Sequence, residues 1–125
     1  MAYQYSFEKL EVWKDARSFV SEIYLITKRF PDNEKHSLTS QLCRAAVSIV
    51  SNIAEGVSRS STKEKTRFLE ISYGSLMEVY CQLCIALDLK YITTNELECL
   101  KLSIDKIANK LTALVKAYNK IKSTV

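Results

Sequence analysis

The sequence has 125 residues, of which 47% are hydrophobic and 26% are charged, and its formal net charge is +4. This length fits a single domain over residues 1–125, and the hydrophobic fraction excludes a disordered chain. Turn residues are scarce, with two glycines and one proline, which excludes an all-β fold and favours long helices. The sequence has no recognisable secretion signal and no apolar run near the about 20 residues of a membrane span, so we expect a cytoplasmic protein without a membrane partner.

Two helices are predicted in the first half of the chain. The first covers about residues 8–29, where Trp13, Ala16 and Val20 begin an apolar stripe with spacings of three and four. It ends before Pro31, because proline disfavours a helical conformation at the preceding residue. The second covers about residues 34–56 and should end at Gly56, since glycine takes a left-handed C-terminal position without steric penalty.

Two longer helices are predicted in the second half. Ser61 and Glu64 have the spacing of a capping box, as do Thr93 and Glu96, so these helices should cover about residues 62–90 and 94–122. In the last helix, apolar residues recur with an average spacing of 3.5, which indicates coiled-coil-like packing. Four helices with short connections predict an all-α fold, an up-down-up-down antiparallel four-helix bundle.

A polar network is predicted between the second and third helices. Asn52 falls on the apolar seam of the second helix with Glu55 one turn away, and Ser75 and Glu78 lie on the third helix. A polar residue on such a seam costs stability but can fix the register of two helices. An acid–base pair of Glu55 and Glu78 is the alternative interpretation.

The residue types that catalysis and metal binding most often use are scarce. His36 is the single histidine and is expected to be a solvated loop residue, and two glycines are too few for a glycine-rich phosphate loop. Cys81 and Cys84 form a C-x-x-C pattern inside the third helix, where we expect packed, reduced thiols rather than redox or metal chemistry. We therefore predict a non-enzymatic protein with no cofactor and no metal site.

The basic excess is concentrated in two segments. The linker before the third helix and the first turns of that helix hold Arg59, Lys63, Lys65 and Arg67. At 100° per residue, four lysines of the last helix share an arc of roughly 120° that lies almost opposite its apolar seam. These lysines are Lys106, Lys110, Lys116 and Lys120. Both clusters are candidate nucleic-acid surfaces, and an ordinary solvated face is the alternative for the lysine stripe.

The segment of residues 41–56, which reads QLCRAAVSIVSNIAEG, resembles the signature of a known family. The family comprises the four-helix-bundle proteins encoded in intervening sequences of bacterial 23S ribosomal RNA genes. Other landmarks stand in the family's order, so the resemblance covers nearly the whole chain. They are Leu10-Glu-Val-Trp13, Phe30-Pro31, Phe68-Leu69, Gly74-Ser-Leu-Met-Glu78 and Tyr91-Ile92.

The resemblance implies a ring-like homopentamer, similar to the accessory variability protein of diversity-generating retroelements, which binds a reverse transcriptase and nucleic acid. Asn52, Glu55 and Gly56 match the signature as structural residues, and Arg44 within it joins the candidate nucleic-acid-binding residues. We therefore predict a homo-oligomer that binds structured RNA or a reverse-transcriptase-like protein. A protein-interaction scaffold without nucleic-acid binding is the alternative function.

Overall fold

The computed structural model describes residues 3–123, which fold almost entirely into helices. The four long helices are α1 (Glu11–Thr27), α2 (Leu38–Val57), α3 (Thr62–Asp88) and α4 (Thr94–Ser123), and the two short 3-10 helices are η1 (Ser6–Lys9) and η2 (Asp32–Glu34). No strand occurs in this part of the chain. The predicted all-α fold is confirmed.

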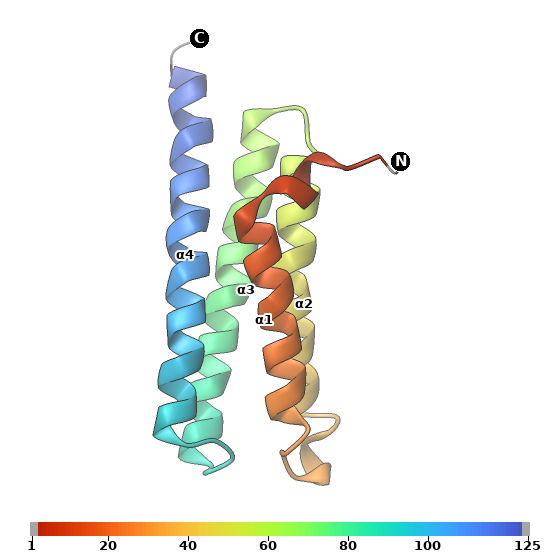
Figure 1. Cartoon of the computed structure of the whole chain (residues 1–125), viewed down its shortest axis with the longest axis vertical. Helices are drawn as coiled ribbons and strands as arrows, with labels where there is room; N and C mark the ends of the chain where they lie inside the picture. The colour runs from red at the N-terminus through yellow and green to blue at the C-terminus, as the bar shows by residue number, and fades with distance from the viewer. Residues whose placement is uncertain (1–2, 124–125) are drawn as a thin grey trace.

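The four long helices stand at the corners of a bundle. α1 and α3 each pack against α2 and α4, whereas the diagonal pairs stay apart. Figure 1 shows the three connections at alternating ends, so that consecutive helices run in opposite directions. α2 and α3 share the most extensive contact, while α1 and α4 share the least. The α1–α4 seam is therefore the least closely packed side of the bundle.

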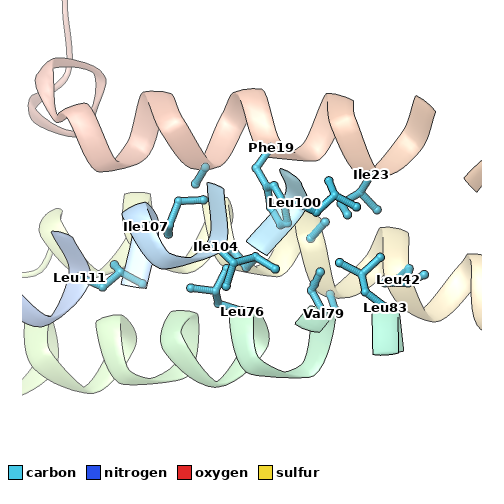
Figure 2. Close-up of a cluster of buried hydrophobic side chains, with 14 of the residues drawn as sticks. Phe19, Ile23, Leu42, Leu76, Val79, Leu83, Leu100, Ile104, Ile107 and Leu111 are labelled. Carbon is cyan, nitrogen blue, oxygen red and sulfur yellow. The ribbon is translucent and has the colours of Figure 1, made fainter. Parts of the chain in front are cut away.

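Apolar side chains from all four helices meet in one core (Figure 2). The large side chains that are fully buried are Phe19, Ile23, Leu42, Ile49, Ile53, Leu69, Leu76, Val79, Leu83, Ile104, Ile107 and Leu111. Removing each of them from water contributes about 1.5–3 kcal/mol before the loss of conformational entropy is subtracted. Leu111 is the last fully buried side chain of α4 among the described residues, and the later turns of α4 contact the edge of the core through Leu114, Val115 and Tyr118.

The first two helices begin later than the sequence predicts. α1 begins at Glu11 rather than residue 8, because Leu10 is extended, with φ −80° and ψ 128°, and separates α1 from η1. α2 begins at Leu38 rather than residue 34, because η2 and the turn after it occupy residues 32–37. Both corrections replace a predicted first turn of α-helix by a tighter 3-10 turn.

Gly56 does not end α2 in a left-handed conformation, so that prediction is wrong. It lies inside the helix, which continues to Val57, and its φ is not positive. A Cβ atom at this position would lie 2.8 Å from Phe68 Cβ and 3.2 Å from the carbonyl oxygen of Lys65. Gly56 is therefore needed for the close approach of α2 and α3 near their connection.

The predicted capping box is complete before α4, whereas at α3 one of its two bonds is present. The Glu64 amide donates to Ser61 Oγ at 3.1 Å at the start of α3. Before α4, the Thr93 amide donates to Glu96 Oε1 at 2.9 Å, and the Glu96 amide donates to Thr93 Oγ1 at 3.2 Å. These bonds satisfy amide groups that the first turn of a helix leaves without partners.

α3 ends at Asp88, two residues before the predicted boundary. Lys90 adopts a left-handed conformation with φ 64°. The Tyr91 amide donates to the Ala86 carbonyl oxygen at 2.9 Å, and the Lys90 amide donates to that of Leu87 at the same distance. This pair of bonds is a Schellman motif, in which a lysine takes the position that glycine usually occupies.

Candidate nucleic-acid interface

The basic linker between α2 and α3 is organised around the ring of Phe68. The guanidinium carbon of Arg59 lies 4.8 Å from the centre of this ring, and that of Arg67 lies 5.5 Å from it. Arg59 Nη2 also lies 2.9 Å from Glu55 Oε1, one turn earlier on the chain. A cation–π contact at an exposed site contributes about 0.5–1 kcal/mol, so the Phe68 ring helps to order both guanidinium groups at the surface.

Lys65 connects this linker to the C-terminal half of α4. Its Nζ donates to the Val57 carbonyl oxygen at 3.0 Å and lies 5.4 Å from the centre of the Tyr118 ring. Burial raises the pKa of the Tyr118 hydroxyl above its usual value, so the phenol is neutral at physiological pH. Figure 1 shows the α2–α3 connection and the C-terminal half of α4 at the same end of the bundle. Two basic segments that are distant in the sequence therefore meet.

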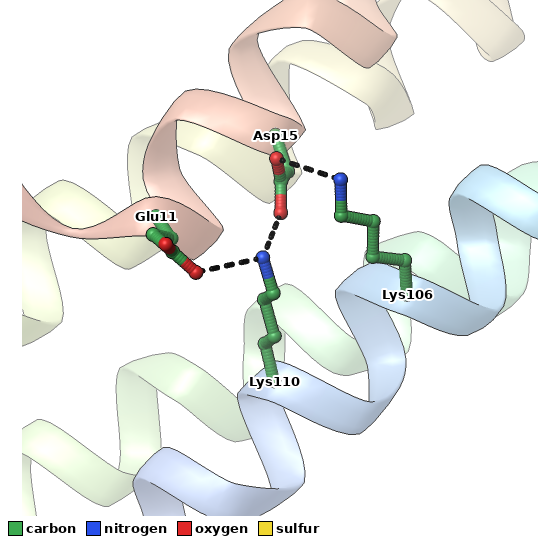
Figure 3. A network of polar contacts seen from close by, with 4 residues as sticks. All are labelled: Glu11, Asp15, Lys106 and Lys110. Carbon is green, nitrogen blue, oxygen red and sulfur yellow. Dashed lines mark hydrogen bonds and ion pairs between the residues drawn. The ribbon is translucent and has the colours of Figure 1, made fainter.

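Two of the four lysines in the predicted stripe on α4 are paired with acidic residues of α1. Lys110 Nζ lies 2.6 Å from Asp15 Oδ2 and 3.1 Å from Glu11 Oε2, and Lys106 Nζ lies 3.4 Å from Asp15 Oδ1 (Figure 3). Both acids belong to α1, so these two lysines bridge the α1–α4 seam. An arc drawn on an isolated helix includes positions at its edge that a neighbouring helix can reach.

The charges of this bridge shift one another's pKa values. Burial opposes the ionisation of Asp15, but the hydrogen bonds and charges of Lys110 and Lys106 outweigh it and hold the Asp15 pKa below its usual value. Hydrogen bonds to Asp15 and then to Glu11 raise the pKa of Lys110. The bridge is therefore charged at neutral pH and neutralises part of the positive charge of α4.

Lys116 and Lys120 are the remaining lysines of the predicted stripe. Neither has a carboxylate oxygen within 4.0 Å among residues 3–123. Lys116 borders an apolar groove of about 330 Å³ between α3 and α4. On the linker, Lys63 and Arg67 likewise have no carboxylate partner within that distance in the described part of the chain.

Six of the nine predicted nucleic-acid-binding residues share one end of the molecule, which we call the basic end. They are Arg59, Lys63, Lys65, Arg67, Lys116 and Lys120. Lys106 and Lys110 lie outside it because their charges are paired with α1. Arg44 also lies outside it, since it belongs to the first half of α2 and its Nη2 is 3.9 Å from Glu78 Oε2.

The predicted polar network separates into two clusters between α2 and α3. In the first cluster, Ser48 Oγ and Ser75 Oγ are 2.9 Å apart, and Asn52 Nδ2 donates to Ser48 Oγ at 3.0 Å. Ser72 adds a buried bond, because its Oγ donates to the Ile49 carbonyl oxygen at 2.8 Å. The prediction omitted Ser48 from the network, although a position four residues before Asn52 lies on the same face of the helix.

Glu55 and Glu78 take different partners, so the prediction of one network is wrong and no acid–base pair forms. Glu55 pairs with Arg59, whereas Glu78 Oε2 accepts from Gln82 Nε2 at 3.1 Å. The same nitrogen donates to Gln41 Oε1 at 3.2 Å. Gln82 is only 7% exposed, and its Oε1 has no hydrogen-bond partner. This second cluster ties α2 to α3, and the spacing of Glu78 and Gln82 on one helix face is the signal that could have indicated it.

The cysteines and His36 form no site in the part of the chain that the structure describes. The four cysteines are free; Cys43 and Cys84 are half-buried, whereas Cys81 and Cys99 are exposed. The prediction that Cys81 packs inside the bundle is therefore wrong. No three His, Cys, Asp or Glu side chains within residues 3–123 are placed to hold a metal ion. None of the described helices is long and apolar enough to cross a membrane.

These features define a small antiparallel four-helix bundle with one basic end. The sequence matches the family of the 23S rRNA-intervening sequence protein over residues 8–113, and the chain belongs to this family. Its fold is similar to the crystal structure of a protein with unknown function from the S23 ribosomal protein family of Bacteroides thetaiotaomicron, with a TM-score of 0.78. That protein is 23% identical in sequence, and the alignment covers 84% of this chain and 95% of that one. No curated protein matches the chain.

Proposed function

We propose that this protein is a non-catalytic, cytoplasmic homo-oligomer that binds structured RNA through its basic end. Five subunits is the number that the family resemblance implies. The observation that carries the proposal is the meeting of two basic segments, distant in the sequence, at one end of the bundle. The contact of Lys65 with the Tyr118 ring marks the place where they meet.

The positive charge of the basic end is largely unopposed. Of its six cations, only Arg59 has a carboxylate oxygen within 4.0 Å among the described residues. Each phosphate that such a cation neutralises releases condensed counterions, which favours binding and makes it dependent on salt. In a homo-oligomer the fields of several basic ends add together.

The aromatic residues of the basic end favour recognition of a folded RNA by its backbone. The rings of Phe68 and Tyr118 are in contact with cations of the same chain. They are therefore not free platforms on which unpaired bases would stack, as proteins that bind single strands provide. Ordered cations suit the regular phosphates of a double-helical region, because less side-chain freedom is lost on binding.

A protein-interaction scaffold is the second candidate function, and a groove at the opposite end favours it. This groove of about 590 Å³ lies between α1 and α4, and its apolar lining includes Leu25, Ile26 and Leu100. A helix of a reverse-transcriptase-like protein is one kind of partner that could occupy it. A complex that survives both high salt and nuclease would favour this function over RNA binding.

Binding of a labelled, structured RNA across a salt series tests the basic end. The test variant combines Lys63→Gln, Arg67→Gln and Lys120→Gln. Each phosphate contact contributes about −0.7 to −0.9 to the slope of log affinity against log salt. We therefore expect the variant to bind more weakly at low salt and to have a slope that is smaller by about 2–3.

A matched variant removes the same formal charge from the opposite end by combining Lys35→Gln, Lys90→Gln and Lys101→Gln. These three lysines are exposed, and the circular dichroism of both variants should match that of the wild type. The matched variant should keep the wild-type slope. Equal losses in both variants would contradict a localised site, and no binding by the wild type at low salt would contradict RNA binding altogether.

A further inference from the structure

The outer face of α3, opposite the core, is largely exposed, and Glu78 is the residue on it that pairs within the described chain, with Arg44 at 3.9 Å and with Gln82 at 3.1 Å. The residues along it recur with spacings of three and four: Ile71, Gly74, Glu78, Cys81, Ile85 and Asp88. Ile71 is 40% exposed and Ile85 is 44% exposed. α3 therefore carries two seams, one in the core and one at the surface, and this spacing is the pattern with which helices pack against one another.

Gly74 has no role in the packing of its own chain. A Cβ atom at this position would meet nothing within 4 Å, and the φ of Gly74 is not positive. Glycine inside a helix is less stable than alanine by about 0.5–1 kcal/mol. At Gly56 the close approach of the α3 backbone and Phe68 accounts for a glycine, but at Gly74 no described residue of the same chain accounts for one. The exposed glycine leaves a gap on the outer face of α3 that a side chain of another molecule can fill.

Beyond Arg67, which lies one turn before Ile71 on the same face, the charges of α3 have one sign. From Phe68 to Leu89 the charged residues are Glu70, Glu78 and Asp88, with no basic residue among them. Glu70 and Asp88 have no cationic nitrogen within 4.0 Å in the described part of the chain. A partner that packs here should therefore present cations.

The outer face of α1 offers the complementary charge. Lys14 and Arg17 are exposed there, and Lys28 follows directly after the end of α1 beside the α1–α4 groove. The Arg17 guanidinium carbon lies 5.4 Å from the centre of the Trp13 ring, and none of the three cations has a carboxylate oxygen within 4.0 Å among residues 3–123. Ser21 and Tyr24 complete a face with the same spacings of three and four. The acidic residues of α1 lie along the seam with α4, so they do not offset these cations on the outer face.

We propose that the outer face of α3 in one copy packs against the outer face of α1 in the next copy. This inference rests on the homo-oligomer of the proposed function and names its subunit contact. Because α1 and α3 stand at opposite corners of the bundle, one copy presents both faces at once. The two helices run in the same direction (Figure 1), so the copies lie side by side and parallel. A contact between two different faces repeats from one copy to the next, and it forms a ring when the rotation between copies closes.

The two faces match in size when Arg17 stands opposite Gly74. Tyr24 then stands opposite Cys81, so that both of these large side chains of α1 meet a small residue of α3. This arrangement resembles the insertion of a knob on one helix into a hole on its neighbour. It accounts for the exposed glycine and for the exposed cysteine of α3.

The same register also matches the charges of the two faces. Lys14 comes opposite Ile71, next to Glu70, and Lys28 comes within one turn of Asp88. Opposite charges at the edges of a helix pair select the partner and fix the register. A contact between two copies of α3 would instead bring acidic faces together, and one between two copies of α1 would bring cations together.

Two variants that each alter one face test this contact by light scattering. Arg17→Glu puts an acid against the acidic face of α3 and leaves its own α3 intact. Gly74→Trp fills the gap on α3 and leaves its own α1 intact. Each variant alone should have the mass of one chain, 14.3 kDa, while the wild type has several times that mass. An equimolar mixture should give a one-to-one dimer, because one intact α3 face then meets one intact α1 face.

Two further variants make each outcome decisive. Lys35→Glu reverses a charge outside both faces and should keep the wild-type mass. Ile85→Glu alters the same face of α3 and replaces Gly74→Trp if circular dichroism shows that the tryptophan unfolds the bundle. Single variants with the wild-type mass, or a mixture that stays monomeric, would overturn this surface but leave the RNA proposal intact, since the salt series is read separately. A wild type of 14.3 kDa at micromolar concentration would overturn both the homo-oligomer and the surface.

Discussion

Gly56 and Gly74 both lie inside helices, but their surroundings predict opposite responses to the same substitution. In the Arg17→Glu background, in which the proposed subunit contact is broken, Gly74→Ala adds a methyl group into open space and should raise the free energy of unfolding by about 0.5–1 kcal/mol. Gly56→Ala places a methyl group 2.8 Å from Phe68 Cβ and against the backbone of α3, and overpacking of this kind costs about 1–3 kcal/mol. Urea unfolding followed by circular dichroism, at one fixed protein concentration, measures both changes.

The two alanine variants serve as controls for each other, because they make the same chemical change in a helix interior. A loss of stability in both would show that Gly74 is needed within its own chain, and it would remove one argument for the contact between α1 and α3. A gain in both would show that α2 and α3 can separate at Gly56 with little cost.

The ion pairs of Asp15 across the α1–α4 seam should make the free energy of unfolding depend on pH. Because its folded pKa is lower than its unfolded pKa, the charged carboxylate stabilises the fold above the unfolded pKa of about 3.9. This contribution is lost as the pH falls through the folded pKa. Asp15→Asn should therefore lower the melting temperature at pH 7, while the difference from the wild type shrinks towards pH 2–3.

Asp105→Asn is the comparison for Asp15, because Asp105 pairs with Lys101 at 3.1 Å one turn away on the exposed surface of α4. Exposed pairs of this kind contribute about 0.3–0.5 kcal/mol, so the melting temperature should change little at either pH. A loss at pH 7 for Asp15→Asn that persists unchanged at low pH would contradict the assigned role of its charge.

At the level of elements, the N-terminal cap of α3 stabilises the first turns of this helix, which carry Lys63 and Lys65 of the basic end. Ser61→Ala removes the acceptor for the Glu64 amide and should lower the free energy of unfolding by about 1 kcal/mol. Ser60→Ala, one residue earlier on the same exposed connection, should change it by less than about 0.5 kcal/mol. Chemical unfolding measures both, and equal losses would show that the cap does not stabilise the start of α3.

The existence of the four helices could be predicted from the sequence, but several of their ends could not. Apolar residues three apart continue through the 3-10 turn η1, at Phe7, Leu10 and Trp13, so periodicity alone does not separate that turn from α-helix. Residues 32–37, which include η2, hold no apolar residue that could mark where α2 begins. The end of α3 depends on Lys90 in a left-handed conformation, which few residues other than glycine adopt. At Gly56 the opposite error occurred. A glycine near a helix end was predicted to take a left-handed conformation, but it is needed for the close packing of α2 against α3.

The candidate site was predicted only in part, because its geometry depends on neighbouring helices. A helical wheel of α4 groups its lysines correctly but cannot show that Asp15 of α1 reaches Lys106 and Lys110. The predicted polar network between α2 and α3 also depends on which partners are in reach. Glu55 pairs with Arg59, four residues later in the chain, and not with a residue of α3. Contacts within one helix can be predicted from the spacing of residues in the sequence. Contacts between two helices can be predicted only when the register of the two helices is known.

At the scale of the whole molecule, alternating connections place separate functions at separate parts of the surface. The α2–α3 connection and the C-terminus of α4 necessarily share one end of an up-down bundle, which is why two distant basic segments combine. The faces of α1 and α3 lie along the sides. RNA binding at the end and subunit contact along the sides can therefore be altered independently.

The last turns of α4 allow this independence to be tested. Leu111 is the last fully buried side chain of the described α4, and the match to the family ends at residue 113. A chain that ends at residue 113 should still unfold in one transition. It should lose about 2–3 kcal/mol of stability, because the partly buried Leu114, Val115 and Tyr118 are removed. Its salt slope for RNA should shrink by about 2–3 as the lysines of this segment are lost.

The mass of the shortened chain decides whether the two surfaces are separate. Light scattering should show the same number of subunits as in the full chain, because the faces of α1 and α3 remain intact. In the full chain, Lys116→Gln with Lys120→Gln should reproduce most of the loss of slope without the loss of stability, because both side chains are outside the core. A shortened chain that is monomeric would show that the end of α4 contributes to the subunit contact. A shortened chain with the wild-type slope would show that α4 adds nothing to the basic end, so that RNA binding would depend on the α2–α3 linker alone.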